Sequence, residues 1–144
     1  MLKRIPAILS PELLKILMEM GHGDEIVIGD GNFPAASCAK RLVRCDGHGV
    51  PALLDAILTL MPLDRYVEAP LSLMALSGGD TEIPIIWDTY RAIVEQHEPG
   101  VRFEQLERFA FYERARQAYA VVATGEHAVY ANVILKKGVV TVSD

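Results

Sequence analysis

The chain has 144 residues, the usual size of one domain, and we expect residues 1–144 to form a single domain. Apolar residues make up 51% of the chain, charged residues make up 23%, and the net charge is −5. This composition is typical of an ordered globular protein. It shows neither the basic face of a nucleic-acid-binding protein nor an apolar run near the roughly 18 residues of a membrane span.

The N-terminal segment and the cysteines indicate a cytoplasmic protein. Residues 1–10 contain a short basic stretch and a brief apolar stretch that Pro6 breaks, and no small-residue cleavage site follows. Cys38 and Cys45 lack C-x-x-C spacing. We therefore expect reduced thiols in a cytoplasmic protein rather than a zinc site.

Helix and strand patterns alternate through the first half of the chain. Ser10 followed by Pro11 is a favoured start for a helix, and an apolar stripe continues from there to Gly21, where the helix is expected to end. Three further elements are predicted: a buried strand at 25–29 (EIVIG), a strand at 41–45 (RLVRC) and a helix at 50–61.

The second half continues the alternation. Its clearest amphipathic helix covers residues 83–97 and ends before Pro99-Gly100. The remaining patterns predict strands at 70–76, 101–107, 119–125 and 130–142, the last with a turn or bulge at Gly138, and a helix at 108–118. Alternating helices and strands are typical of a layered α/β domain.

His22 is the first candidate for chemistry. It stands between two glycines, after a predicted helix and before a predicted strand. The glycines allow a sharp turn and leave the imidazole accessible, and a histidine can both donate and accept a proton near neutral pH. A histidine in a surface loop is the alternative interpretation.

Asp24 and Asp30 flank the strand at 25–29. Asp24 fits a local cap or ion pair. Asp30 could accept hydrogen bonds from a sugar hydroxyl, or equally form an Asx turn with its own backbone. A strand of this length spans roughly 13 Å, so His22 and Asp30 face one small substrate only if the chain bends sharply or if a neighbouring subunit supplies one of them. We favour the second hypothesis, which predicts an obligate oligomer.

Further polar candidates occur near the C-terminus. Tyr130 and Asn132 would share one face of the strand predicted at 130–142, where a phenol and an amide suit the recognition of hydroxyl groups. A polar edge strand is the alternative. Arg108 could bind a sugar through its fork of donors, or it could be a solvated arginine near a helix end.

Other kinds of site find little support in the sequence. No second histidine cluster accompanies His22 and Asp24, as a metal site would require. Neither a P-loop nor a G-x-G-x-x-G nucleotide motif occurs, and there is no G-x-S-x-G nucleophile elbow. We therefore expect neither a metal nor another cofactor.

Three segments resemble the fucose mutarotase and ribose pyranase family: 9–35 (LSPELLKILMEMGHGDEIVIGDGNFPA), 108–115 (RFAFYERA) and 130–139 (YANVILKKGV). The similarity runs from near residue 1 to about residue 140, and GHGDEIV…D…FP is its most specific part. The arginine-containing segment 108–115 looks like the fucose branch, because the ribose branch tends to carry a histidine near that point. Asn32 stands where some relatives have another polar residue.

The resemblance implies a three-layer α/β/α domain that assembles into rings pairing as decamers, with sites shared between subunits and no cofactor. It implies that His22 is the catalytic acid/base and that Asp30, Arg108 and the Tyr130-Ala131-Asn132 segment bind a monosaccharide. The implied reaction interconverts the α and β anomers of a sugar, L-fucose in this branch, by opening and closing the ring.

Three alternatives remain open at this point. The chain could be a D-ribose pyranase that exchanges pyranose and furanose forms. It could be a sugar-binding accessory protein without catalysis, which would bind one anomer and leave the exchange rate unchanged. A metal-dependent hydrolase around His22 and Asp24 would instead lose its activity with a chelator.

Overall fold

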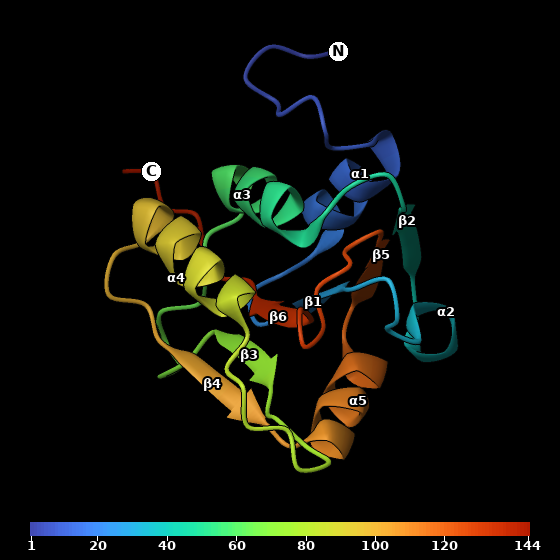
Figure 1. Ribbon diagram of the computed structural model, residues 1–144. Helices are drawn as coiled ribbons and strands as arrows, with labels where there is room; N and C mark the ends of the chain where they lie inside the picture. Colours follow the sequence, from blue (N-terminus) through green and yellow to red (C-terminus); the bar gives the residue numbers. More distant parts are fainter.

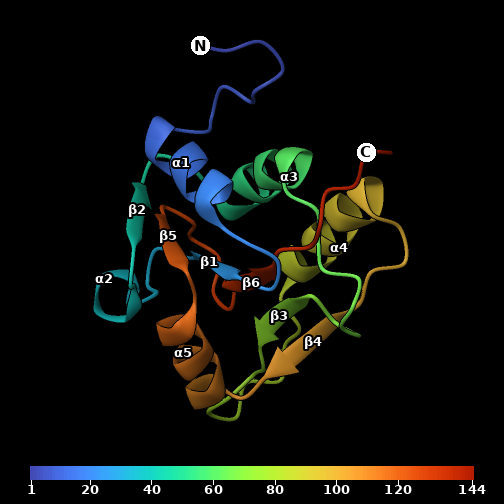
Figure 2. The same cartoon turned by 180° about the vertical axis from the view of Figure 1, so that it is seen from behind.

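A six-stranded sheet forms the centre of the molecule in the computed structural model, which describes residues 1–144 (Figure 1). The strands are β1 (Glu25–Gly29), β2 (Leu42–Cys45), β3 (Leu71–Met74), β4 (Phe103–Leu106), β5 (Ala120–Thr124) and β6 (Val133–Lys136). They lie in the order β2-β5-β1-β6-β3-β4, so β2 and β4 form the two edges, as Figure 2 shows from behind. β6 runs antiparallel to β1 and β3, and all other pairs are parallel.

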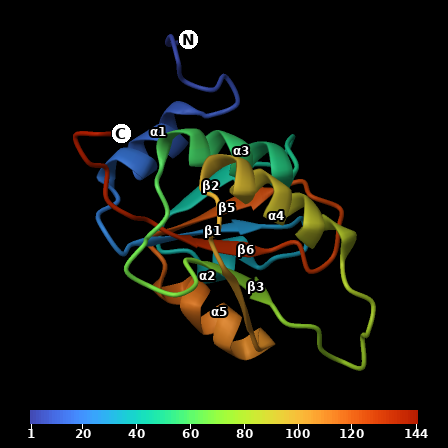
Figure 3. The ribbon, with the colours of Figure 1, turned by 90° about the vertical axis from the view of Figure 1, so that its left-hand side faces the viewer.

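Five helices cover the two faces of this sheet (Figure 3). Those on one face are α1 (Pro11–Glu19), α3 (Val50–Leu60) and α4 (Ile85–His97), and those on the other are α2 (Ala35–Cys38) and α5 (Arg108–Gln117). The apolar core accordingly divides into a cluster of 26 buried residues under α1, α3 and α4 and a cluster of 11 under α2 and α5. The three-layer α/β/α arrangement expected from the sequence is confirmed.

The local signals for helices and strands act as the sequence predicts. Ser10 caps α1 by accepting the N–H of Leu13 at 3.2 Å, and Pro11 occupies the first turn. The central strands β1, β3 and β5 are buried along nearly their whole length, as expected for strands covered by helices on both faces. None of the helices has the length and apolar character needed to cross a membrane.

The predicted strand at 130–142 is much shorter in the structure. β6 begins only at Val133 and ends at Lys136. Tyr130 precedes it with φ 54°, a left-handed conformation that a strand residue cannot adopt. The expectation that Tyr130 and Asn132 alternate along one strand face is therefore wrong. The short helix α2 was not predicted, because four residues carry no helical periodicity.

The pairing of β1 with β6 places the two ends of β1 next to different segments of the chain. Glu25 lies opposite Lys136 at the end of β6, and Ile28 lies opposite Val133 at its beginning. The segment that carries His22 therefore lies near the residues that follow β6. Asp30 lies near the residues that precede β6, at the other end of the sheet.

Gly125 provides a test of this packing. A Cβ at this position would collide with the backbone carbonyl oxygen of Asp46, and the N–H of Gly125 donates to the carbonyl of His48 at 2.9 Å. We expect Gly125→Ala to lower the free energy of unfolding by about 1–3 kcal/mol in urea titrations, because the backbone must shift to admit the methyl group. Gly47→Ala is the control, since a Cβ there meets nothing within 4 Å. Equal losses in the two variants would contradict the close approach.

Candidate functional site

Asp30 lies in a buried polar cluster at the carboxyl end of β1, with 6% of its surface exposed. Its N–H donates to Oδ1 of Asn132 at 2.8 Å. Its carboxylate accepts the N–H of Asn32 at 3.0 Å and the N–H of Ala131 at 3.4 Å. The Asx turn considered from the sequence is thus present, and the same contacts fix Asp30 against Ala131 and Asn132.

The surroundings of Asp30 disfavour its charge. Burial raises the pKa of this carboxyl group above its ordinary value. The backbone N–H groups of Asn32, Ala131 and Phe33 lower the pKa, but they do not cancel the effect of burial, and the nearby Glu126 raises it further. The fold therefore holds an acidic group where its ionised form is costly, a feature that functional sites often show.

Tyr130 lies beside this cluster, but its hydroxyl group already has partners. The hydroxyl donates to Oδ2 of Asp80 at 2.6 Å and accepts the N–H of Ser77 at 3.2 Å. The phenol therefore ties the segment before β6 to the loop that follows β3.

Arg108, the first residue of α5, faces a shallow hollow of about 200 Å³. The residues that line this hollow are Met74, Ser77, Arg108, Val129 and Tyr130. The guanidinium carbon of Arg108 lies 5.6 Å from the centre of the Tyr112 ring, and the side chain makes no ion pair within the chain. Its N–H donors therefore remain available to a ligand.

His22 lies at the opposite end of β1. Its Nε2 is 3.1 Å from Oδ1 of Asp64, and its ring centre is 5.3 Å from that of Tyr66. The His22 side chain is 47% exposed, whereas that of Asp64 is 5% exposed. The imidazole is thus held on one side by a buried carboxylate and is open to solvent on the other.

Asp64 determines how the His22 ring is protonated. Burial opposes ionisation of Asp64, but hydrogen bonds from the Tyr66 N–H and from His22, with the charges of His22 and Lys136, hold its pKa below the ordinary value. A carboxylate only accepts hydrogen bonds, so Nε2 of His22 carries the proton in this pair. The nitrogen left for a substrate is Nδ1.

Asp64 is a functional candidate that sequence reasoning missed. It lies 42 residues from His22 in the chain and belongs to no recognisable motif. The isolated bridge between Leu63 and Lys137, with the N–H of Asp64 donating to the carbonyl of Lys136 at 3.0 Å, brings its segment to the end of β6, next to the residues before β1. No local pattern in the sequence predicts the contact between His22 and Asp64.

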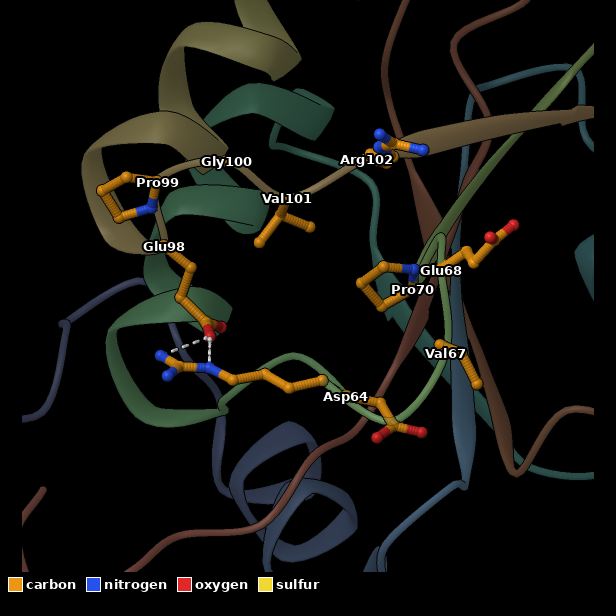
Figure 4. Close-up of a pocket in the computed structure, with 10 residues that line it drawn as sticks. Asp64, Val67, Glu68, Pro70, Glu98, Pro99, Gly100, Val101 and Arg102 are labelled. Carbon is orange, nitrogen blue, oxygen red and sulfur yellow. Dashed lines mark hydrogen bonds and ion pairs between the residues drawn. The ribbon is translucent and has the colours of Figure 1, made fainter.

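A polar hollow of about 480 Å³ adjoins Asp64, between the segments 64–70 and 98–102 (Figure 4). Glu98 projects into it and forms an ion pair with Arg65 at 3.2 Å, and it also accepts the N–H of Leu63 at 2.6 Å. These contacts hold together the loop that carries Asp64. His22 does not line the hollow.

The candidate residues therefore form two groups. The histidine group consists of His22, Asp64 and Tyr66, and the aspartate group consists of Asp30, Arg108, Tyr130, Ala131 and Asn132. The structure brings together the predicted sugar-binding residues at one end of β1, and it does not bring His22 to them within one chain. No three His, Cys, Asp or Glu side chains are placed to hold a metal ion.

Comparison with known proteins gives full-length matches. Residues 3–140 match the model of the RbsD / FucU transport protein family. The chain is 50% identical over 148 residues to the fucose mutarotase of Homo sapiens, covering 99% of this chain and 96% of that protein. It is 57% identical, with a TM-score of 0.92, to a crystal structure of the fucose mutarotase from Streptococcus pneumoniae in complex with L-fucose, over 97% of this chain and 100% of that one.

The similarity to a ribose complex is weaker. Bacillus subtilis RbsD complexed with D-ribose shows 26% identity and a TM-score of 0.71, over 98% of this chain and 100% of that one. The chain is thus more similar, in sequence and in structure, to proteins named fucose mutarotase.

The raised pKa of Asp30 predicts how stability depends on pH. Protonated Asp30 contributes to the free energy of unfolding below its ordinary pKa of about 4. This contribution is lost as the pH rises through the raised pKa of the folded protein. The asparagine of Asp30→Asn carries no charge to bury. We therefore expect the free energy of unfolding of the variant, minus that of the unchanged protein, to increase from about pH 4 to pH 7 in urea titrations at the two pH values.

The exposed Asp88 provides the matched control for this experiment. Asp88→Asn removes the same charge from a side chain that is 82% exposed and pairs only with Arg91 at 3.5 Å, and we expect a smaller response to pH than in Asp30→Asn. A parallel pH response in the two variants would show that burial of Asp30 is not the cause.

Proposed function

We propose, because the chain belongs to the RbsD / FucU transport protein family, that it is an isomerase interconverting the α and β anomers of L-fucose. The full-length similarity to proteins named fucose mutarotase carries this proposal. The aspartate group supports it, because carboxylate, amide and guanidinium groups suit the hydroxyls of a monosaccharide.

The proposed reaction opens and closes the sugar ring. An acid protonates the ring oxygen, a base removes the proton of the anomeric hydroxyl, and the bond between C1 and the ring oxygen breaks. The open aldehyde rotates about the C1–C2 bond, and the ring closes on its other face. Positioned proton transfer typically accelerates a reaction by about 10²–10⁴-fold, which suffices for mutarotation because it also proceeds slowly in water without a catalyst.

His22 is the proposed acid/base. Asp64 accepts a hydrogen bond from the Nε2–H of His22, which leaves Nδ1 to exchange a proton with the sugar. During ring opening, Nδ1 of His22 takes up the proton of the anomeric hydroxyl, and the imidazolium that results delivers a proton to the ring oxygen. His22 thus acts as a base and then as an acid, and ring closure reverses both transfers. Asp64 fixes the ring and stabilises the imidazolium form that follows proton uptake.

The aspartate group is the proposed binding half of the site. Oδ1 of Asn132 is occupied by the Asp30 N–H, so the NH₂ group of Asn132 is left to donate to a sugar oxygen. Asp30 would accept from hydroxyl groups and Arg108 would orient the sugar. Tyr130 would shape the pocket with Ala131, since its own hydroxyl is engaged by Asp80.

A shared site requires an oligomer, and exposed side chains support one. Tyr66 of the histidine group is 82% exposed, and Phe109 and Val129 beside the aspartate group are 70% and 62% exposed. Aromatic and apolar side chains exposed around polar groups often mark interfaces. We propose that the histidine group of one subunit docks against the aspartate group of the next.

A head-to-tail contact forms a ring where the rotation between neighbouring subunits closes, and we propose a ring of this kind, a pentamer or a pair of pentamers forming a decamer. We further propose that residues 1–144 act as one domain of a cytoplasmic protein, an assignment that the free thiols of Cys38 and Cys45 support.

His22→Ala tests the assignment of the acid/base. We expect saturation transfer between the anomeric proton signals of L-fucose in the unchanged protein, and a loss of at least about 100-fold in the variant. D-ribose and D-galactose are measured in parallel. His48→Ala, at an exposed loop position, is the control and should retain the full rate. Full exchange in His22→Ala would remove the assignment, and exchange of ribose alone would identify the other branch of the family.

Asp64→Asn tests the role of the buried carboxylate. The amide cannot stabilise a charged His22 and does not select its tautomer, so we expect mutarotation to slow by roughly tenfold or more. Asp55→Asn is a matched control, because Asp55 likewise contacts a histidine, His97, at 2.7 Å but lies in neither group. If both variants keep the full rate, Asp64 plays no part in the reaction.

A further inference from the structure

The segment before β6 is held in a conformation that its own sequence does not favour. Tyr130 has φ 54°, and a non-glycine residue seldom adopts the left-handed region. Such a conformation persists where the surrounding structure imposes it, and it is found most often at functional sites. Contacts from outside the segment must therefore hold Tyr130.

Two of these contacts come from α4. Nε1 of Trp87 donates to the carbonyl oxygen of Tyr130 at 2.8 Å, and the hydroxyl of Tyr90 donates to the carbonyl oxygen of Ala131 at 2.7 Å. Trp87 and Tyr90 are three residues apart and therefore lie on the same side of the helix. Both are buried, with 2% and 0% of their surfaces exposed. Two consecutive carbonyl groups are thus fixed by one helix.

The direction of a carbonyl group also sets the direction of the next N–H. In a trans peptide unit the C=O and N–H bonds point to opposite sides. When Trp87 draws the Tyr130 carbonyl toward α4, the N–H of Ala131 is turned the other way, where it lies 3.4 Å from Oδ2 of Asp30. The next residue, Asn132, accepts the N–H of Asp30 at 2.8 Å. The two helix donors therefore set the geometry between Asp30 and Asn132.

We propose that Trp87 and Tyr90 are positioning residues for sugar binding, which act through the backbone of Tyr130 and Ala131 without touching the sugar. This inference rests on the proposed function, because it assigns the two side chains to the binding half of that site. It explains why a tyrosine and a tryptophan of α4, buried under an apolar sheet, both direct their polar atoms to one loop.

Tyr90→Phe removes the hydroxyl and keeps the ring. We expect the KM for L-fucose to rise roughly five- to twentyfold while kcat changes by less than about twofold, because contacts made equally in the ground and transition states are weakened. A merely structural role would lower the active fraction, and with it the apparent kcat, at an unchanged KM. Tyr119→Phe is the control: its hydroxyl donates to Glu19 at 2.9 Å and makes no hydrogen bond to either group, and its KM should not change.

Hydrogen exchange followed by mass spectrometry tests the positioning without any sugar. Peptides that contain residues 130–132 should exchange roughly tenfold faster in Tyr90→Phe than in the unchanged protein, and equally in Tyr119→Phe. Trp87→Phe removes the other donor and serves the same comparison if Tyr90→Phe does not fold.

The KM and the exchange rate of residues 130–132 in Tyr90→Phe together test the positioning role of α4. A raised KM together with faster exchange of this segment supports it, and an unchanged KM or unchanged exchange overturns it. If the unchanged protein neither binds nor interconverts any sugar, the proposed function fails. The exchange comparison still shows in that case whether α4 holds the segment.

Discussion

The pairing of β1 is the constraint on which the rest of the account depends. β1 hydrogen-bonds to β5 on one side and to β6 on the other, and both helical layers cover it. A strand fixed on both edges and both faces cannot bend to bring its ends together. His22 and Asp30, which flank it, are therefore kept roughly a strand length apart, which is the reason for proposing a site that joins two subunits.

Each half of the proposed site is prepared separately within the chain. Asp64, itself buried, selects the tautomer of His22, and α4 together with Asn132 fixes the backbone around Asp30. In the proposed assembly, the two groups would meet with their side chains already held in place, so little further ordering would accompany sugar binding. Burial raises the pKa of Asp30, so the ionised form of this carboxyl group is costly in the fold, as is common at functional sites.

The sequence predicted most of the fold, because the elements carry local periodicity and clear start and stop residues. It failed at Tyr130, whose left-handed backbone depends on Trp87, 43 residues away, rather than on its neighbours. Asp64 was missed for a similar reason, since a contact over 42 residues leaves no local pattern. Asp30, Arg108, Tyr130 and Asn132 were candidates from their chemistry, and the family resemblance assigned them to sugar binding together with Ala131. Only the structure shows that these residues meet at one end of β1.

Mixed oligomers test the shared site most directly. His22→Ala subunits lack a working histidine group, and Asp30→Asn subunits lack a working aspartate group. When the two are mixed in equal amounts and assemble at random into a head-to-tail ring, an intact His22 meets an intact Asp30 at about one quarter of the junctions. The account predicts that mutarotation returns to about that fraction after co-assembly. It also predicts no recovery when His22→Ala is mixed with Asp64→Asn, because both changes affect the histidine group. If confirmed mixed oligomers of the first pair stay inactive, the site is not shared in this way.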